Sequence, residues 1–383
     1  MVTDMDQSLA HSRRANPTGP PDERRKAALD LRRQLPRRAL AEWAPQANRT
    51  DPVGILVEQG KNRIQDLLPV RYFRLQADPF AFFRGAAAIM ATDLVSMPST
   101  GIRLQACGDA HFANFGSYAT PEGTPIFDLN DFDETLPCPF EWDVKRLAAS
   151  LAVAGRVAQL TKKGCDALAC TAARSYRQYM AELAPMPPVV AWSQRIDLVK
   201  AVADIDSIKL RRKMQKRLAD LLKSGARQFG LVEEHRGGLR IREKPPFVRR
   251  LDKHELHARK AFASYAKTLQ EDRRLLLQRY ALQDVAYKVV GVGSVGTFCA
   301  IGLLVSGSGA PMLLQIKEAQ QSVLAPFAGA SEYSNQGQRV VWGSGCCRPR
   351  PTCSLGGRRR QSSGGISTSG GSRIRGSPIS ARD

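Results

Sequence analysis

The chain has 383 residues, of which 43% are hydrophobic and 24% charged, so it can bury a sizeable core as one large or two smaller domains. No segment approaches the ~20 apolar residues of a membrane-spanning helix, and the start lacks the apolar core of a secretory signal. The formal net charge is +21. Composition therefore excludes a membrane-spanning protein, and we expect a cytoplasmic one. Five cysteines precede residue 342, an odd number without paired spacing that favours reduced thiols.

The first part of the chain is basic and interrupted by proline, and it predicts a mobile arm over residues 1–50 with a helix near 22–34. Residues 51–284 are expected to form a helix-rich domain. Its first helix is predicted over residues 53–68, where apolar residues recur at helical spacing. Asp78 and Pro79 start a further helix, largely buried, that runs to Val95. Arg84 stands there in apolar company, and it pairs either with a site carboxylate or phosphate or within an interior ion pair.

Residues 108–134 read GDAHFANFGSYATPEGTPIFDLNDFDE and form the segment richest in chemistry. Phosphoryl transfer needs a carboxylate that orients the attacking hydroxyl and oxygen ligands that hold Mg²⁺. Asp109 and Asn114 have the D-x-x-x-x-N spacing of a kinase catalytic loop. A turn-rich stretch and a β-like run follow, so a hairpin would bring Asp131 back beside Asn114. The alternative is that these acids cap turns and the asparagine satisfies loop backbone. Cys107, next to the segment, is expected to be a buried filler.

Helices dominate the next part of the chain. A strongly helical run begins at Glu141, with Asp143 in its first turn and Lys145 and Arg146 expected to face solvent. Further helices are predicted at about 164–183, 196–224 and 254–281. The basic stretch 209–227 has apolar residues close to helical spacing, so its charges form the opposite face. That face is either solvated or binds nucleic acid or an anionic membrane surface, although no nucleic-acid motif accompanies it.

Residues 285–341 contain a predicted β unit of strand, glycine turn, strand, loop and strand. The turn, Gly291 to Gly296, is a GxGxxG sequence between two β-rich runs, whereas a Rossmann fingerprint would open a helix. A glycine hairpin over nucleotide phosphates, followed by a lysine on the third strand, is the kinase arrangement. This predicts a nucleotide site with these residues: Gly291, Gly293, Ser294, Gly296 and Lys317. The alternative is a glycine-kinked hairpin with an edge lysine.

The motifs together resemble the aminoglycoside and choline kinase branch of the protein-kinase-like fold. Gly108 to Asn114 matches its HGDxHxxN fingerprint, Asp131 to Glu134 its IDFDD, and Trp142 to Val144 the start of its third motif. The resemblance implies Mg²⁺ and ATP as cofactors, with Asp109 as the base. Asn114 and Asp131 would hold the metal, with Asp128 and Asp133 as the rivals of Asp131. His111 either touches substrate or holds backbone carbonyls.

From about residue 51 to 341 the chain is similar to the bacterial domain of unknown function 2252 family, through DPVGILVEQGKNRIQDLLPVRYFRL, CGDAHFANFG, FDLNDFDETLPCPFEWDVKRLAASL and YKVVGVGSVGT. The resemblance implies an α+β, kinase-like fold, helix-rich with a small antiparallel sheet. In an ordinary kinase the glycine loop precedes the catalytic loop, and here it follows. Either the fold is circularly permuted, or one of the two motifs lies outside the site.

The last part, residues 342–383, is dominated by Gly, Ser, Arg and Pro and predicts a disordered tail. Codons exist for residues 342–357 whose neighbouring frame spells GQRLLQAASDLFLGW, an amphipathic helix. We therefore hypothesise a frameshift near residues 340–343, and the truncation it causes could leave the protein inactive.

Three functions follow from these patterns. The leading hypothesis is a Mg-dependent, ATP-using phosphotransferase that binds nucleotide and an unknown phosphate acceptor. The second is a metal-dependent phosphoesterase, because Asp109 and His111 also form a D-x-H pair. The third is a non-catalytic basic protein that binds nucleic acid or a partner.

Overall fold

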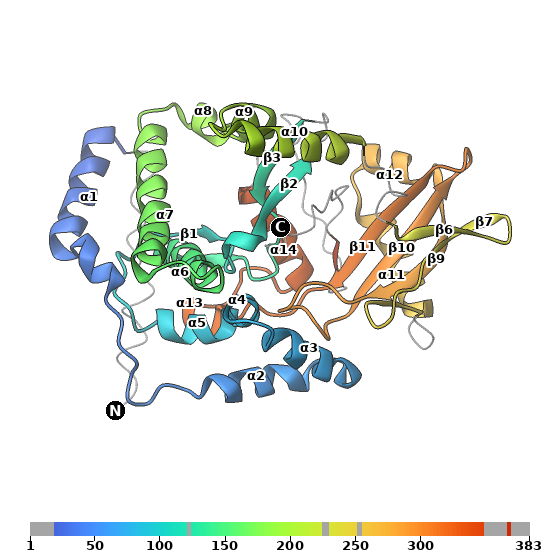
Figure 1. The fold of residues 1–383 in the computed structure, drawn as a ribbon, viewed down its shortest axis with the longest axis horizontal. Helices are drawn as coiled ribbons and strands as arrows, with labels where there is room; N and C mark the ends of the chain where they lie inside the picture. Colours follow the sequence, from blue (N-terminus) through green and yellow to red (C-terminus); the bar gives the residue numbers. More distant parts are fainter. Residues whose placement is uncertain (1–18, 121–123, 224–229, 251–254, 348–365, 369–383) are drawn as a thin grey trace.

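Most of the helices and the largest antiparallel sheet occupy different sides of the molecule (Figure 1). The structure, a computed structural model, describes residues 19–120, 124–223, 230–250, 255–347 and 366–368. Most of the helices lie on one side, and the largest antiparallel sheet lies on the other with α11 (Glu255–Thr268) and α12 (Glu271–Leu277) (Figure 1). The expected helix-rich α+β architecture with small antiparallel sheets is therefore confirmed. In these ranges, no helix combines the length and the apolar character needed to cross a lipid bilayer.

The first helices are shorter than predicted. Helix α1, Pro21–Gln34, confirms the helix near 22–34, and a 3₁₀ turn, Arg37–Ala41, follows. The predicted helix 53–68 is broken: α2 is Pro52–Lys61, a 3₁₀ turn covers Gln65–Leu67, and α3 is Leu68–Leu75. The break has a tertiary cause, because the Ile64 N–H donates to the Gly296 carbonyl at 2.8 Å. Val53 and Val57, expected on the apolar face, are 63% and 51% exposed.

The predicted helix that starts at Asp78 is also two helices, α4 (Pro79–Gly85) and α5 (Ala87–Leu94). Asp78 begins α4 by accepting the Ala81 N–H at 2.8 Å. At its end, the Phe83 carbonyl accepts the Ala86 N–H at 3.1 Å and the Arg146 guanidinium at 3.0 Å. The i→i+4 ladder stops there, so the chain bends and α5 takes a new direction.

Residues 103–120 and 124–139 form four strands. Strand β1, Arg103–Ala106, pairs antiparallel with β4, Leu136–Pro139. Strands β2, Phe115–Ala119, and β3, Pro125–Leu129, form the predicted hairpin, with Phe115 opposite Leu129. The short β5, Ile196–Asp197, extends this sheet at β3. Just below the hairpin, Asn130 N–H donates to the Asn114 carbonyl at 2.8 Å, which brings the two arms of the predicted site segment together.

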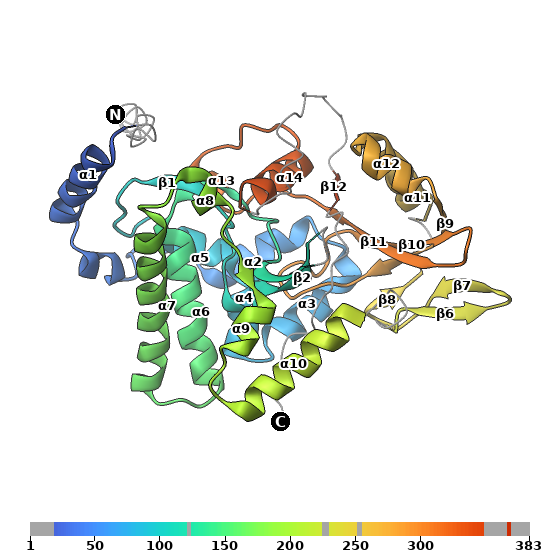
Figure 2. The ribbon, with the colours of Figure 1, turned by 90° about the horizontal axis from the view of Figure 1, so that it is seen from above.

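Two long helices, α6 (Glu141–Val157) and α7 (Lys162–Leu183), pack side by side (Figure 2). Helix α8, Pro188–Trp192, follows. The predicted helix 196–224 is instead β5, α9 (Leu198–Ala203) and α10 (Ile208–Lys223), because Asp197 caps a new helix at Val199 and Lys200. Helix α10 runs from the helical side toward the β6–β7 hairpin (Figure 2), and Leu210 on its expected apolar face is 45% exposed.

The larger sheet has the strand order β12-β11-β10-β9-β8. Its strands are β8 (Val248–Arg249), β9 (Tyr280–Lys288), β10 (Cys299–Ser306), β11 (Pro311–Glu318) and β12 (Ile366–Thr368). The predicted strand, glycine turn, strand and strand unit is thus present. Beside it lies the hairpin of β6 (Val232–His235) and β7 (Gly238–Ile241).

Helix α11, Glu255–Thr268, covers one face of the sheet, where Phe262 rests on Gly302, a position at which any larger side chain would overlap the ring. The predicted helix 254–281 ends early: α12 is Glu271–Leu277, and β9 begins at Tyr280. The run YALQDVAYK is rich in β-forming residues and pairs with β10, so sheet pairing prevails over helix formation there.

The chain then returns to the helical side through α13, Ala325–Ala328, and α14, Gln336–Cys347. Residues 342–347 of the predicted tail are therefore helical. Residues 348–365 and 369–383 of the predicted tail lie outside the described residues, and so do residues 1–18 of the predicted arm.

Candidate functional site

A glycine turn and a buried carboxylate shape the loop after β1. The N–H groups of Cys107 and Gly108 donate to the Asp143 carboxylate at 2.7 and 3.0 Å. Gly108 has φ +83°, and a Cβ there would overlap the Glu134 carbonyl, so only glycine fits. Burial raises the pKa of Asp143 to about 6, and the two N–H donors oppose that rise. Asp143 is thus a loop anchor. Burial raises the pKa of the Cys107 thiol well above its usual value, as expected for a buried filler.

Asn114 joins the two halves of the site segment. Asn114 is only 5% exposed, and its Nδ2 donates to the Asp109 carbonyl and to the Asp131 carbonyl, both at 3.0 Å. The amide therefore holds Asp109 and Asp131 at a fixed separation. Because Nδ2 makes these bonds, Oδ1 is the atom with which Asn114 could bind a metal ion.

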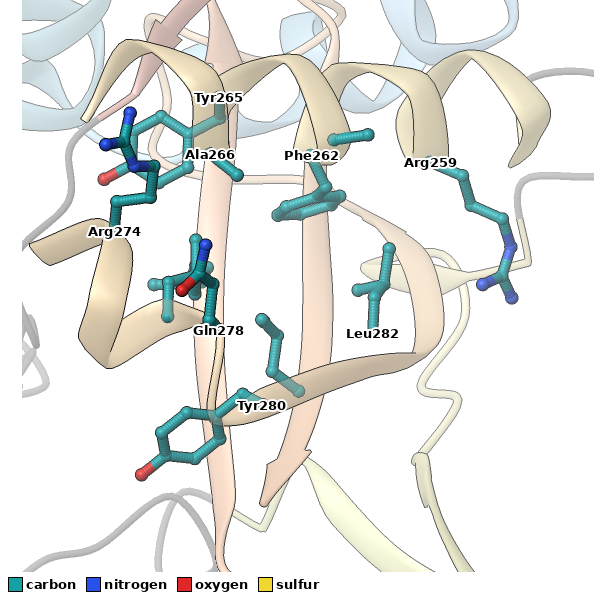
Figure 3. A pocket seen from close by; sticks show the side chains of 12 residues that line it. Arg259, Phe262, Tyr265, Ala266, Arg274, Gln278, Tyr280 and Leu282 are labelled. Atoms are coloured by element: carbon teal, nitrogen blue, oxygen red, sulfur yellow. The ribbon is translucent and has the colours of Figure 1, made fainter. Parts of the chain in front are cut away.

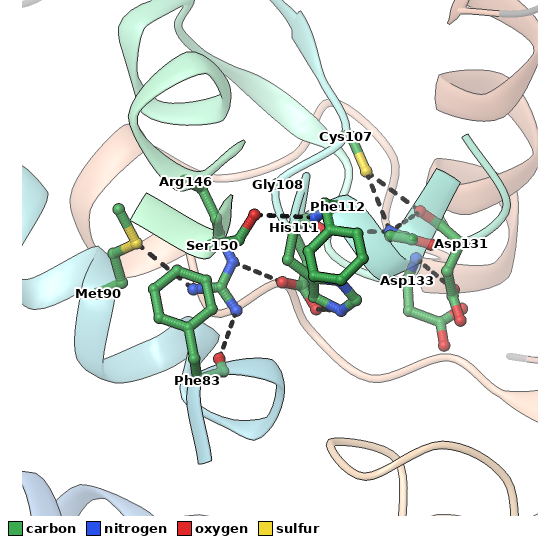
Figure 4. Close-up of polar contacts among 12 residues, drawn as sticks. Phe83, Met90, Cys107, Gly108, His111, Phe112, Asp131, Asp133, Arg146 and Ser150 are labelled. Atoms are coloured by element: carbon green, nitrogen blue, oxygen red, sulfur yellow. Dashed lines mark hydrogen bonds and ion pairs between the residues drawn. The ribbon is translucent and has the colours of Figure 1, made fainter. Parts of the chain in front are cut away.

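Asp109 is paired with a residue that we expected to face solvent. Arg146 is 2% exposed, and its Nε donates to Asp109 Oδ1 at 2.5 Å (Figure 4). The guanidinium also binds the Phe83 carbonyl and lies 4.5 Å from the centre of the Phe83 ring. The expectation was wrong because the buried face of α6 is the one that carries Trp142, Arg146 and Ser150. Their i, i+4 spacing was a signal in the sequence that the charge of Arg146 concealed.

His111 lies on the other side of the same carboxylate. Its Nε2 is 3.8 Å from Asp109 Oδ2, and the residue is 7% exposed. Burial lowers the pKa of His111, with Arg146 and Arg84 opposing protonation and Asp109 favouring it. The imidazole is therefore expected to be neutral near pH 7. Its Nδ1 is buried without a hydrogen-bond partner among the described residues.

Lys317 connects the sheet to the acidic segment. It stands near the end of β11, is 4% exposed, and its Nζ lies 2.8 Å from Asp131 Oδ2 and 3.1 Å from Asp133 Oδ2. The predicted nucleotide lysine and two of the predicted metal-binding acids thus share one site. The carboxyl groups that contact Lys317 belong to Asp131 and Asp133. Glu332, the only acid in the sequence between Glu318 and residue 342, is exposed.

The carboxylates of Asp131, Asp133 and Glu134 act on one another electrostatically. Burial and the charge of Asp131 raise the pKa of Asp133, and Lys317 opposes the rise. Burial raises the pKa of Glu134 to about 7, although the Val323 N–H donates to its Oε2 at 2.7 Å. This concentration of negative charge attracts a cation, and the Lys317 ammonium occupies that position.

Asp128, the rival of Asp131, belongs to the hairpin. It pairs with Gly116 across β2 and β3, and its carboxylate accepts the Tyr118 hydroxyl at 3.3 Å and the Leu129 N–H at 2.7 Å. Of the two acids, Asp131 is the one whose backbone is tied to Asn114 and whose carboxylate binds Lys317.

Two arginines bind the glycine loop between β9 and β10, and the sequence did not predict either contact. Arg74 donates to the Gly291 carbonyl at 2.5 Å, and Arg63 donates to the carbonyls of Gly293 and Val295 at 2.7 and 2.6 Å. A trans peptide directs its N–H opposite its C=O. The N–H groups that follow these three carbonyls, those of Val292, Ser294 and Gly296, therefore point away from the guanidinium groups.

The chain was compared with known protein families, curated proteins and solved structures. Residues 63–349, most of the chain, match the model of a family described as an uncharacterized protein conserved in bacteria (DUF2252). The chain belongs to the DUF2252 family. No curated protein and no solved structure shows a significant match. The expected family is confirmed, and a reaction has to be argued from the geometry of the site.

In this DUF2252 chain a pocket lies elsewhere, between α11, α12 and the sheet (Figure 3). It measures about 250 Å³, and its lining combines Phe262, Leu282 and Tyr280 with two rim arginines, Arg259 and Arg274. None of the predicted site residues lines it, so it is separate from the carboxylate cluster.

The donor set at the carboxylate cluster limits which metal it could hold. Across the described ranges, no three His, Cys, Asp or Glu side chains gather as a metal centre. Asp131, Asp133 and Asn114 Oδ1 offer only oxygen ligands, and Mg²⁺ takes one or two carboxylates and completes its shell with water and substrate phosphates. The residues therefore fit Mg²⁺ better than a transition metal.

Proposed function

We propose that this protein is a magnesium-dependent, ATP-using phosphotransferase of kinase-like fold. The observation that carries the proposal is the 2.8 Å contact between Lys317 and Asp131. It joins a lysine on the third strand of a glycine-loop sheet to an acid that follows a D-x-x-x-x-N loop, and a kinase site needs these parts together.

Each residue has a role in this proposal. Arg146 holds Oδ1 of Asp109 and so fixes the orientation of the carboxylate, whose Oδ2 orients the acceptor hydroxyl. Lys317, held against Asp131 and Asp133, is in position to pair with nucleotide phosphates. Mg²⁺ bound by Asp131, Asp133 and Asn114 would neutralise charge on the transferred phosphoryl group.

Circular permutation agrees with the order of these parts. Strands β9, β10 and β11 carry the glycine loop and then the lysine, as kinases do, yet they follow the Asp109 loop in the chain. The sheet contributes its lysine to the carboxylate cluster irrespective of that order, because Lys317 contacts Asp131 through the fold and not through the sequence. We therefore include permutation in the proposal.

The phosphoesterase alternative fits less well. Arg146 already binds Asp109 Oδ1, and His111 Nε2 lies 3.8 Å from Oδ2 in a buried setting. A metal at this D-x-H pair would sit next to a guanidinium cation, which disfavours it electrostatically. No observation in the described residues favours the nucleic-acid-binding alternative over a solvated basic face.

We also propose a frameshift near residues 340–343, although the family match continues to residue 349 and α14 to Cys347. The support is the codon degeneracy that permits GQRLLQAASDLFLGW in the neighbouring frame of residues 342–357. The nucleotide sequence decides this point: a neighbouring frame that does not encode an amphipathic helix refutes it. If the frame does encode one, the corrected full-length chain is the form to assay beside this one.

Nucleotide binding tests the proposed function. We expect Mg-ATP to raise the melting temperature of the wild-type protein, and EDTA to abolish the increase. Lys317→Met and Asp131→Asn should each lose the increase, measured against the same variant without ligand. Lys162→Met is the matched control, because the Lys162 side chain is 90% exposed on α7. Equal stabilisation of wild type and Lys317→Met would refute the proposed site.

A further inference from the structure

Arg63 and Arg74 bind the glycine loop, and their hydrogen bonds, like those of Arg71, go to neutral oxygens. Arg63 and Arg74 bind loop carbonyls, and Arg71, which is fully buried, donates to the Leu56 carbonyl at 3.1 Å and to Gln59 Oε1 at 2.9 Å. Burial lowers the pKa of each of these three arginines and of Arg84. Carbonyl dipoles satisfy donors but do not neutralise charge, so these contacts leave the charges of Arg71 and Arg74 uncompensated, whereas Glu134 and Glu318 act on Arg63.

Arg84 is the least satisfied member of this group. Its Nε is buried without a hydrogen-bond partner among the described residues, as are those of Arg63 and Arg71, but those two guanidinium groups make other hydrogen bonds and that of Arg84 makes none there. The nearest acids in its field are Asp109 and Asp78, both of which are already engaged. Asp109 binds Arg146, and Asp78 accepts the Ala81 N–H at the start of α4. Arg84 is half-buried, and a bound anion would stabilise a partly desolvated guanidinium that has no ion-pair partner among the described residues.

Arg84 lies between the glycine loop and the segment that carries Asp109. A Cβ placed on Gly293 would sit 3.4 Å from the Arg84 carbonyl, so the glycine loop packs directly on the end of α4. Asp109 and His111 lie within electrostatic range of its guanidinium. Burial lowers the pKa of Arg74 and that of His111, and the charge of Arg84 lowers both further. Arg84 is therefore close to the loop and to the proposed base at once.

We propose that Arg84, assisted by Arg74, binds a phosphate group between the glycine loop and Asp109. A guanidinium fork suits a tetrahedral oxyanion because it donates two parallel hydrogen bonds. The inference deepens the proposed phosphotransferase function and rests on it for the kind of ligand. The phosphate belongs either to the nucleotide or to an acceptor that is itself phosphorylated, and both sources present the same group to Arg84.

The test uses the full chain, Mg²⁺-free buffer and three probes: inorganic phosphate, pyrophosphate and ATP, each against chloride at equal ionic strength. Arg84→Gln should weaken pyrophosphate binding at least about 10-fold, which corresponds to the loss of one charge-assisted hydrogen bond. Without ligand, its melting temperature should equal or exceed that of wild type, because an uncompensated charge has been removed. Arg156→Gln, an exposed position on α6, is the control and should change neither quantity.

The outcomes separate the possibilities. Loss of ATP and pyrophosphate binding together assigns the site to the nucleotide, whereas loss of inorganic phosphate binding with ATP binding unchanged assigns it to the acceptor. Unchanged affinity for all three probes overturns the inference, as does a lower melting temperature of Arg84→Gln with unchanged affinity. If Mg-ATP binding requires Lys317 and Asp131 while Arg84→Gln has no effect, the inference fails alone. If pyrophosphate binds through Arg84 and Mg-ATP does not bind, the proposed function fails alone.

Discussion

Lys317 and Asp131 are separated by 186 residues, and their side chains meet at 2.8 Å. One comes from a sheet and the other from the turn after a distant hairpin. A second carboxylate, that of Asp133, receives the same ammonium at 3.1 Å. The charges of Lys317, Asp131 and Asp133 therefore compensate one another in a partly buried site. The contact joins the two sides of the molecule.

Removal of the ammonium should destabilise the protein, and removal of a carboxylate should restore part of the loss. Lys317→Met removes the ammonium that lies between Asp131 and Asp133, and we expect a decrease of about 1–3 kcal/mol in the free energy of unfolding. Asp131→Asn in the same chain removes the repulsion. The double variant should therefore be more stable than Lys317→Met alone in urea denaturation. Simple additivity of the two single changes would show that the ion pair is not coupled.

Arg146 should be essential for stability although it is a charged residue on a helix. Arg146→Met leaves the Asp109 carboxylate and the Phe83 carbonyl without the donor they now share, and we expect a loss of about 2–4 kcal/mol in the free energy of unfolding. Arg156→Met on the same helix is exposed and should change stability by less than about 0.5 kcal/mol. Urea denaturation of both variants measures the difference, and similar values would contradict the buried role of Arg146.

Local signals predicted much of the fold. The alternation of β-forming residues and turn residues predicted the β2–β3 hairpin and the three strands around the glycine loop, because both depend on neighbours in the chain. The spacing of Asp109, Asn114 and Asp131 likewise predicted that they would come together. The prediction of Lys317 as a site residue needed the order of strands but not their packing.

Contacts between distant segments could not be predicted in this way. The break after α2 comes from Arg63 and Ile64 binding the glycine loop more than 200 residues later, and no local pattern announces it. Arg146 looked solvated because charge outweighed its spacing from Trp142. Arg84 was left open between a site and a structural ion pair, and the structure supplies no direct ion-pair partner for it among the described residues.

Asp143 should make stability fall as the pH rises. Burial raises its pKa to about 6 in the folded protein from 3.8, so the folded state binds the proton more tightly than the unfolded state. The contribution is fully present below pH 3.8 and is lost as the pH increases through about 6. The decline should be at most about 3 kcal/mol. Asp143→Asn should flatten this part of the curve in urea denaturation at several pH values, whereas Asp166→Asn, whose side chain is 60% exposed, should not. An unchanged slope in Asp143→Asn would contradict the assignment.

Gly108 and Gly101 offer a matched test of how tightly the loop is packed. Both have positive φ, +83° and +75°, so alanine at either position meets backbone strain of about 1–2 kcal/mol. Only at Gly108 would the new Cβ also overlap the Glu134 carbonyl, whereas nothing lies within 4 Å at Gly101. The Gly108→Ala variant should therefore lose clearly more stability than Gly101→Ala. It should also lose Mg-ATP binding, since the overlap pushes the loop that carries Asp109 away from the segment that carries Asp131. Equal losses in thermal unfolding would mean that the loop relaxes freely, and the close approach of these two segments would then not be required.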